Sequence, residues 1–409
     1  MQTHLSPEFA DSPEAQAAAA MLRKCVHCGF CNATCPTYQL LGDELDGPRG
    51  RIYLIKQVLE GAEVTRSTQQ HLDRCLTCLN CQTTCPSGVE YGHLVDIGRQ
   101  LVEARVERPP LEKAKRWLLK DGLTSPLFAP AMRLGQTLRA VLPEFLKHKV
   151  PARSGDRVSL TPVRPQSRKV LMLQGCVQPS MMPNIDSAAA RVLDRAGIQT
   201  LYAEGAGCCG ALRTHLSDHR GGLQDMRRNI DAWIPWLESG VEAIVSSASA
   251  CGLAVKEYAY ALAEDPEYRD KAARVSAMAR DLSELLPDIV PRLKDRVRAG
   301  HGQRIAFHSP CTLQHGHKLL GGVERHLKTL GFDVTAPSHE SHMCCGSAGT
   351  YSILQPELAK QLRDRKLANL AKLEPQRILS ANIGCIQHLQ SGTSTRVMHW
   401  IELLDEALA

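Results

Sequence analysis

Apolar and polar positions follow one repeating order through the second half of the chain. Two short apolar runs, at residues 170–173 and 305–307, are typical of buried strands. After each run come a helical pattern, a glycine, a short second strand, another helical pattern and a third strand. The expected helices are residues 187–196, 226–237, 322–330 and 356–372, and the expected third strands are residues 243–247 and 377–381. Because strands that alternate with helices favour parallel pairing, we expect two parallel sheets.

The cysteines of the second half repeat with the same spacing as these elements. Four of them lie 134 to 136 residues before four others. The first set is Cys176, Cys208, Cys209 and Cys251, and the second set is Cys311, Cys344, Cys345 and Cys385. Such near-identical offsets indicate an internal repeat of about 135 residues. Because parallel strands form a ligand crevice at their carboxyl ends, we expect the four thiols of each repeat to gather at one sheet edge.

The residues leave open whether these thiols hold a metal. Adjacent side chains in an extended strand point to opposite faces. A glycine follows each cysteine doublet, at Gly210 and Gly346, and permits a turn with positive φ that directs both sulfurs towards one centre. Buried cysteine also serves as a small apolar residue. One further iron–sulfur cluster in each repeat and purely structural cysteines therefore both fit the pattern.

Eight further cysteines form two copies of one motif in the first quarter of the chain. The spacing CxxCxxCxxxCP occurs at residues 25–36 and again at residues 75–86. Three such thiolates converge from one tight turn on a [4Fe–4S] cube, and in two-cluster ferredoxins the fourth cysteine of each run ligates the other cluster. We therefore expect cluster I on Cys25, Cys28, Cys31 and Cys85, and cluster II on Cys75, Cys78, Cys81 and Cys35.

Structural zinc is the main alternative for these eight cysteines, because four thiolates also suit a tetrahedral Zn²⁺ ion. Zinc sites usually pair their ligands across a loop, whereas this spacing gathers three thiolates and ends each run with a proline. A disulfide framework is less expected still. The first 21 residues lack the basic start and the large apolar run of a secretory signal, so we expect reduced thiols.

Composition and charge are those of a multidomain globular protein. A chain of 409 residues predicts two to four domains, and no stretch reaches the ~18 apolar residues of a membrane-spanning helix. The net charge of +6 hides a local excess, since residues 99–169 hold 16 Lys or Arg against 6 Asp or Glu. This segment is rich in proline and is typical of a linker. It could bind an anionic membrane surface or a partner protein, but the favoured interpretation is a basic linker that packs on the chain's own domains. Nucleic acid binding is not indicated, because no aromatic-rich basic patch accompanies the charge.

These observations divide the chain into four parts. We expect a helical ferredoxin-like domain at residues 14–95 and a basic helical linker at residues 96–166, followed by cysteine-rich repeats at residues 167–300 and 301–409. The fold class is α/β and α+β multidomain, with an N-terminal two-[4Fe–4S] domain before two α/β units that each carry a Cys-Cys-Gly (CCG) motif.

No catalytic residue is assigned in this chain. Residues 205–210 satisfy the dinucleotide-binding pattern GxGxxG after a plausible strand at residues 200–203. However, the pattern overlaps the first CCG element, and the equivalent segment 342–346 lacks the first two glycines. We therefore expect no nicotinamide or flavin site here. Hydride transfer needs such a two-electron cofactor, which places substrate oxidation on another chain.

Several segments resemble the iron–sulfur subunit of bacterial glycolate oxidase. They are residues 25–61, 71–91, 306–320, 341–352 and 381–389. The wider group contains CCG domains and includes heterodisulfide reductase B subunits, lactate-utilisation iron–sulfur proteins and the C subunit of anaerobic glycerol-3-phosphate dehydrogenase. Fuller CCG motifs end in CxxC, whereas Ala248 and Asn382 stand three positions before Cys251 and Cys385. Each repeat thus keeps four thiols instead of five, which argues against the noncubane cluster of the heterodisulfide reductases.

The resemblance implies a role in a hetero-oligomeric complex. FAD-containing partner subunits would oxidise glycolate to glyoxylate, and this chain would pass the electrons to a quinone-linked acceptor. The complex would be cytoplasmic and peripherally associated with the inner face of the cell membrane. The alternatives are the same relay for lactate or glycerol-3-phosphate, a catalytic CCG subunit that reduces a disulfide, and a zinc scaffold without redox activity.

Two groups of polar residues near the cysteines have open roles. Arg49 and Arg51 either stabilise a reduced, more negative cluster or pair with the carboxylates of residues 43–46. His308, His315 and His317 surround Cys311, where they either tune a cluster or, as we favour, serve as structural residues.

Overall fold

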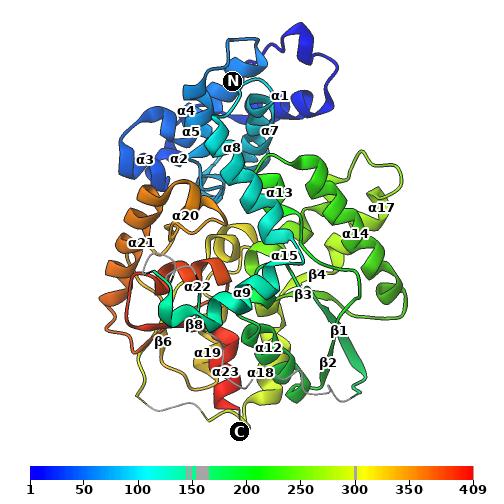
Figure 1. The fold of residues 1–409 in the computed structure, drawn as a ribbon, viewed down its shortest axis with the longest axis vertical. Helices are drawn as coiled ribbons and strands as arrows, with labels where there is room; N and C mark the ends of the chain where they lie inside the picture. The colour runs from blue at the N-terminus through cyan, green and yellow to red at the C-terminus, as the bar shows by residue number, and fades with distance from the viewer. Residues whose placement is uncertain (144–146, 148–149, 153–164, 299–301, 409) are drawn as a thin grey trace.

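The computed structural model describes residues 1–143, 147, 150–152, 165–298 and 302–408. The N-terminal part is helical and lies at one end of the long axis of the molecule (Figure 1). Its helices are α1 (Pro13–Lys24), α2 (Phe30–Ala33), α3 (Pro36–Leu41), α4 (Pro48–Leu59), α5 (Arg66–Asp73), α6 (Asn80–Thr84) and α7 (Tyr91–Glu103). Prolines occupy the first positions of α1, α3 and α4, where the missing N–H costs nothing. The core of this part joins α1, α4, α5 and α7 through residues such as Leu22, Ile55, Leu72 and Leu94.

The segment between the N-terminal part and the first sheet crosses the molecule as short helices. It contains α8 (Pro110–Trp117) and α9 (Phe128–Thr137), and no side chain of either helix is buried. The expected linker of residues 96–166 falls partly outside the described residues. Much of the positive charge near the start of this segment is paired with acidic side chains, because Arg108 and Arg116 both bind Asp73 and Glu112.

Two four-stranded parallel sheets form the rest of the molecule, as the sequence predicts. The first contains β1 (Arg168–Met172), β2 (Ile198–Leu201), β3 (Ile244–Ser246) and β4 (Ala279–Asp281) in the order β2-β1-β3-β4. The second contains β5 (Ile305–Phe307), β6 (Val334–Thr335), β7 (Arg377–Ser380) and β8 (Arg396–His399) in the order β6-β5-β7-β8. All pairings are parallel. The identical order means that the repeat in the cysteines is a repeat in the fold.

Helices cover both sheets and join them through one shared core. The first repeat contains α11 (Gln178–Met181), α12 (Asn184–Arg195), α13 (Ala211–His215), α14 (His219–Glu238), α15 (Ser249–Lys256), α16 (Tyr258–Ala261), α17 (Arg269–Met278) and α18 (Leu286–Leu293). The second contains α19 (Gly322–Thr329), α20 (Tyr351–Leu354), α21 (Pro356–Ala371), α22 (Ile383–Gln390) and α23 (Trp400–Ala407). Helices α12, α18, α19 and α23 lie between the two sheets (Figure 1). Val192, Leu286, Phe307, Leu327 and Trp400 belong to one buried cluster, so the repeats form a single packed body.

The N-terminal part rests on both repeats. The ring of His93 on α7 stacks on Tyr260 of the first repeat with centroids 3.7 Å apart. On the other side, Tyr351 on α20 donates a hydrogen bond to the carbonyl oxygen of Arg74 at 3.1 Å. Buried side chains from both parts, Leu76 and Met343 among them, pack in one small apolar cluster. The cysteines at the base of the N-terminal part therefore face the second repeat.

Candidate metal centres

The two N-terminal cysteine motifs fold as two copies of one loop. Each position of the second motif lies 50 residues after its counterpart in the first. His27 and Thr77 have φ values of 58° and 50°, and Gly29 and Leu79 have φ values of 86° and 61°. Left-handed backbone at a residue such as leucine is uncommon and costs energy. Both loops have left-handed backbone at the same two positions. This shared conformation indicates that the loop geometry serves to direct three thiols inward.

The eight thiols of these loops line two small adjoining cavities. One cavity, of about 30 Å³, is lined by Cys25, Cys28, Cys31, Cys81 and Cys85. The other, of about 20 Å³, is lined by Cys35, Cys75, Cys78 and Cys81. The expected crossed sets are compatible with these linings, and Cys81 lies where the two cavities adjoin. Neither lining contains a carboxylate, so the donor chemistry suits an anionic iron–sulfur cluster.

The two cavities differ in their access to solvent. At the first cavity Cys28 is exposed, and the neighbouring Val26 and Phe30 are 69% and 62% exposed. At the second cavity Cys35, Cys75 and Cys81 are buried. Burial raises the pKa of the Cys81 thiol well above its ordinary value, and the neighbouring Cys78 and Cys75 add to the shift. A thiolate at this depth needs a positive charge beside it, which a bound metal supplies.

Arg49 and Arg51 have different roles, although they lie only two positions apart on α4. Arg49 lines the first cavity, where it is partly exposed and donates to the carboxylate of Glu44 at 2.6 Å. Arg51 is 1% exposed and lines the second cavity. Residues two apart on a helix do not share a face, which is why only one of the two reaches the interior.

The buried guanidinium of Arg51 is held by three groups. Its Nε donates to the carbonyl oxygen of His71 at 2.7 Å, and its terminal nitrogens donate to Thr37 at 3.1 and 3.2 Å. It also pairs with the buried carboxylate of Asp46 at 3.5 Å. Burial disfavours the charged form, yet the charges of Cys75, Tyr91, Cys35 and Asp46 raise the pKa of Arg51 above its ordinary value. The second cavity thus has a permanent cation in its wall.

The four thiols of each CCG repeat also meet, as the expected sheet-edge arrangement requires. In the first repeat Cys208 is in hydrogen-bonding contact with Cys176 and Cys209, and Cys209 is in contact with Cys251. In the second repeat the same chain of contacts runs through Cys311, Cys344, Cys345 and Cys385. Each set comes from the ends of the first and third strands and from the CCG turn between them. Either set can therefore hold one multinuclear centre.

The glycine of each CCG turn has the positive φ that the sequence predicts. Gly210 has a φ of 86° and Gly346 a φ of 87°. A Cβ atom on Gly346 would lie 2.5 Å from the carbonyl oxygen of Ala359, and one on Gly210 would lie 2.8 Å from that of Gly222. Only glycine therefore fits, because the turn needs both the left-handed backbone and close contact with the following helix. The GxGxxG pattern of residues 205–210 is accounted for by this cysteine turn.

One large cavity, of about 1030 Å³, connects the cysteine-rich repeats with the N-terminal part. The thiols of both repeats line it, together with Cys75 and Cys78 of the second N-terminal motif. In addition, Cys311 is in hydrogen-bonding contact with Cys78. The second small cavity therefore adjoins the thiols of the second repeat directly.

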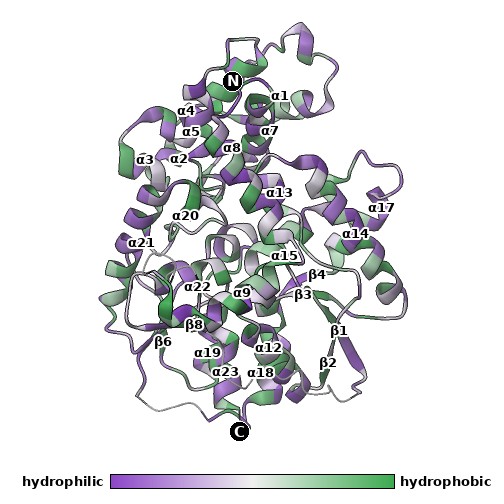
Figure 2. Cartoon of the chain, viewed as in Figure 1, coloured by the Kyte–Doolittle hydropathy of each residue, from purple (hydrophilic) through white to green (hydrophobic). Residues whose placement is uncertain are grey.

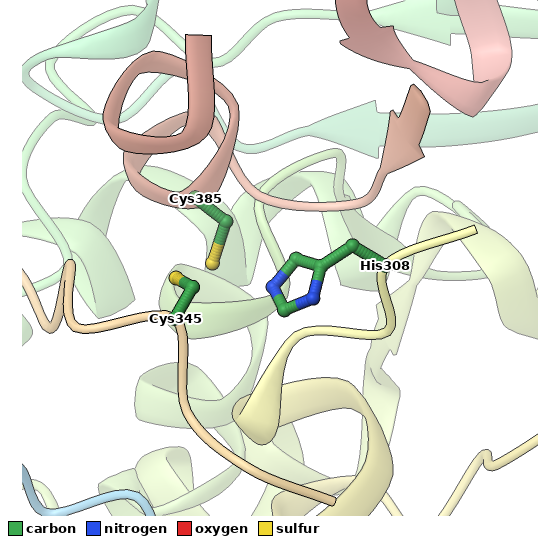
Figure 3. Close-up of side chains that lie close together, drawn as sticks. All are labelled: His308, Cys345 and Cys385. Carbon is green, nitrogen blue, oxygen red and sulfur yellow. The ribbon is translucent and has the colours of Figure 1, made fainter. Parts of the chain in front are cut away.

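The histidines around Cys311 divide into two kinds. The Nε2 atoms of His315 and His317 face the carbonyl oxygens of His342 and Ser249 at 3.1 and 2.9 Å, which makes these two structural, as favoured above. His308 differs, because its Nε2 is buried without a hydrogen-bond partner, whereas the Nδ1 of His317, which is also buried without one, belongs to a ring that its Nε2 already holds. Figure 3 shows its ring directed towards the sulfur atoms of Cys345 and Cys385. These three ligand atoms all lie within 4.8 Å of one another.

His308 is a candidate ligand that the sequence pattern did not single out. Burial, with a further contribution from the charge of Lys366, lowers its pKa well below the ordinary value. The ring is therefore neutral and offers a lone pair, which is the form that binds metals. Its nearness to Cys311 in sequence was the only signal, and two other histidines shared it.

Comparison with known proteins agrees with this architecture. The 4Fe-4S dicluster domain family matches residues 21–89, and the cysteine-rich (CCG) domain family matches residues 170–256 and again residues 305–390. Over 409 residues the chain is 53% identical to the glycolate oxidase iron-sulfur subunit of Escherichia coli (strain K12), covering 100% of this chain and 99% of that protein. The chain belongs to the family of glycolate oxidase iron–sulfur subunits. The resemblance stated from the sequence is thereby confirmed.

Members of this family and its neighbours differ in how far they match. The probable glycolate oxidase iron-sulfur subunit of Bacillus subtilis (strain 168) is 28% identical over 422 residues, covering 94% of each chain. Lactate utilization protein A of Geobacillus thermodenitrificans (strain NG80-2) is 26% identical over 246 residues, covering 58% of this chain and 98% of that protein.

Family membership settles the general role of the chain. It is an iron–sulfur electron-transfer subunit of an oxidoreductase, and its cofactors are [4Fe–4S] clusters. The thiol-rich linings of the two small cavities, which contain no carboxylate, fit this cofactor. Among the described residues, no helix has the length and apolar character needed to cross a bilayer.

Proposed function

We propose that the chain is the electron-transfer subunit of a glycolate dehydrogenase complex. FAD-containing partner subunits oxidise glycolate to glyoxylate, and this chain carries the electrons to a quinone-linked acceptor. The observation that carries the proposal is a series of thiol groups that leads from the exposed Cys28 across two adjoining cavities, both lined by Cys81, to Cys78 and Cys311. The full-length identity to the Escherichia coli subunit favours glycolate as the substrate of the complex.

The two cavities support an assignment of the ligands of the two N-terminal clusters. We assign cluster I to Cys25, Cys28, Cys31 and Cys85, and cluster II to Cys75, Cys78, Cys81 and Cys35, because each set lines one cavity. The crossed fourth cysteine fixes the two centres beside each other. We assign one further cluster to each CCG repeat, since its four thiols are joined by a chain of pairwise contacts.

Solvent exposure supports a direction for the electrons. Cluster I lies where Cys28, Val26 and Phe30 reach the surface, so a flavin-bearing partner can approach it. Cluster II lies deeper and adjoins the second repeat through Cys78 and Cys311. Iron–sulfur clusters exchange single electrons, whereas oxidation of a hydroxy acid releases two. The relay therefore divides the electron pair from the flavin into single steps towards the CCG repeats.

The segment with α8 and α9 supports peripheral contact with the membrane. Leu127 is 74% exposed, Leu134 is 61% exposed, and Trp117 is 62% exposed. Figure 2 shows α9 as apolar over much of its length, although none of its residues is buried. Exposed apolar side chains beside basic residues such as Arg133 suit the surface of an anionic bilayer. This contact would bring the relay close to a membrane quinone.

The test is partner-driven reduction of the purified chain. The chain is isolated anaerobically from cells that also produce its partner subunits, and what copurifies is identified. We expect a flavoprotein that oxidises glycolate, and we expect glycolate to bleach the iron–sulfur absorbance of this chain. The Cys78→Ser variant should interrupt the relay after cluster I. A colourless chain that contains zinc, or a chain that glycolate leaves oxidised in the presence of its partner, would overturn the proposal.

A relay for lactate is a second candidate, because lactate utilization protein A matches 58% of this chain over 98% of its own length. Lactate offered to the same copurified complex separates the two substrates. A disulfide-reducing role is the other candidate, favoured by a cavity of about 1030 Å³ between the thiols of the two repeats. Paired serine variants of Cys208-Cys209 and Cys344-Cys345 would then abolish disulfide reduction but spare reduction of the N-terminal clusters.

A further inference from the structure

The two CCG repeats differ at one position that faces the thiols. The backbone N–H of Leu173 donates to the carbonyl oxygen of Val245 at 2.8 Å, and that of His308 donates to Leu379 at 2.8 Å. Leu173 lies three residues before Cys176, and His308 lies three residues before Cys311. The same strand-end hydrogen bond and the same spacing make Leu173 and His308 equivalent. An apolar side chain in the first repeat is thus replaced by an imidazole in the second.

The buried position of His308 disfavours a polar side chain unless its nitrogen binds something there. Its side chain is 2% exposed, and its Nε2 is buried without a hydrogen-bond partner. Leaving such a group buried and unpaired destabilises the fold, because its hydration is lost and nothing replaces it. The first repeat shows that the fold accepts leucine at this site, so the structure itself does not require a histidine. A bound group that uses the nitrogen lone pair would account for its presence.

The surroundings of Nε2 contain the other ligands of such a group. The ring is directed towards Cys345 and Cys385, and the three ligand atoms lie within 4.8 Å of one another (Figure 3). Metal bonds of ~2.0–2.3 Å place the ligands of one ion within ~4.6 Å of each other. The imidazole and both sulfurs are therefore close enough to bind one metal centre after small side-chain shifts.

We propose that His308 is a nitrogen ligand to an iron of the cluster in the second repeat, beside Cys345 and Cys385. The first repeat, with Leu173 at the equivalent position, binds its cluster through thiolates alone. The proposal rests on the proposed function only in that the second repeat holds an iron–sulfur cluster.

The mixed ligand set has a consequence for electron flow. A neutral imidazole adds no negative charge to the cluster, whereas a thiolate would, and histidine ligation raises the reduction potential of iron–sulfur centres. The second repeat is also the one whose Cys311 meets Cys78 of cluster II. The centre nearest to cluster II would therefore be the better electron acceptor of the two CCG centres, and it would draw electrons out of the N-terminal part.

The experiment detects the iron–nitrogen bond directly. The full chain is produced with ¹⁵N-labelled histidine, purified anaerobically and partly reduced in steps, and pulsed electron paramagnetic resonance is recorded at each step. We expect the coupling of a directly bound ¹⁵N nucleus in one paramagnetic centre of the native chain. This coupling should be lost in His308→Leu, which installs the residue of the first repeat. It should persist in His315→Gln, because the Nε2 of His315 already faces the carbonyl oxygen of His342.

A redox titration provides the second readout. One centre of His308→Leu should shift to a lower midpoint potential or be lost, while the signals of clusters I and II stay unchanged. Absence of histidine coupling at every step in the native chain would overturn the proposal, whatever the variants do. Coupling that survives in His308→Leu, or zinc in place of iron at the second repeat, would overturn it as well. Glycolate-driven reduction without any histidine coupling would reject this inference and leave the proposed function standing.

Discussion

The thiol of Cys311, just beyond β5, is in hydrogen-bonding contact with the thiol of Cys78 in the second N-terminal motif. These two cysteines belong to different parts of the chain and to different expected clusters. Tyr351 joins the same two parts of the chain through its hydrogen bond to the carbonyl oxygen of Arg74. The boundary between the ferredoxin-like part and the CCG part is therefore a point where the thiols of two proposed metal centres adjoin.

This contact predicts magnetic coupling between cluster II and the centre of the second repeat. In the fully reduced chain their unpaired spins should interact, so the electron paramagnetic resonance spectrum should be split or broadened. Replacing Cys344 and Cys345 by serine should remove the second-repeat centre and restore the simple signal of cluster II. The matched change of Cys208 and Cys209 in the first repeat should leave the coupling in place. A native spectrum equal to the sum of isolated centres would contradict the prediction.

The buried cation beside cluster II predicts a selective effect on its potential. Arg51 lines this cavity, whereas Arg49 is bound to Glu44. Removing a buried positive charge disfavours the more negative, reduced cluster. We expect Arg51→Gln to lower one reduction potential by roughly 60 mV, which is about 1.4 kcal/mol for one electron. Arg49→Gln should change the reduction potential of cluster II far less.

Redox titration of both variants, monitored by electron paramagnetic resonance, checks this difference. Iron content should match the native chain, which shows that Arg51→Gln still folds around both clusters. Equal shifts in the two variants would mean that the buried position of Arg51 has no special influence.

A buried carboxyl group in the first repeat predicts a pH dependence of stability. Burial raises the pKa of Asp186 to about 6, although Ser247 and Gln178 donate hydrogen bonds to it at 2.6 and 2.8 Å. The folded chain therefore holds this proton more tightly than the unfolded chain does. The contribution of Asp186 to the free energy of unfolding therefore falls by up to ~3 kcal/mol as the pH rises from about 4 to about 6. Above that pH the contribution stays level.

Thermal unfolding of Asp186→Asn against the native chain measures this contribution. The variant keeps an oxygen for both hydrogen bonds but has no charge to bury. The stability difference between the two proteins should change between pH 4 and pH 6 in favour of the variant. The exposed Asp295→Asn serves as control and should follow the native chain at each pH. A constant difference between Asp186→Asn and the native chain would contradict the assignment.

The sequence determined the parallel sheets and the cysteine groups because both depend on local spacing. The fourth strands, β4 and β8, were not predicted, since Ala279–Asp281 and Arg396–His399 are short and not uniformly apolar. They form by pairing with β3 and β7, which is a tertiary effect. The special position of His308 was equally hidden. Its neighbours Cys345 and Cys385 are distant in sequence, and only folding brings them to its ring.

The exposed apolar segment around α8 and α9 predicts reversible binding to anionic membranes. Leu127 and Leu134 would enter the headgroup region, and basic side chains would be attracted by the surface charge. Flotation of the complex with vesicles should show binding to anionic lipid, weaker binding to neutral lipid and partial release at high salt, because salt screens surface charges. The double variant Leu127→Glu and Leu134→Glu should bind several-fold less. Leu320→Glu changes a leucine that is 62% exposed elsewhere and should bind like the native chain. If all three proteins stayed in solution with anionic vesicles, the complex would need another route to its quinone.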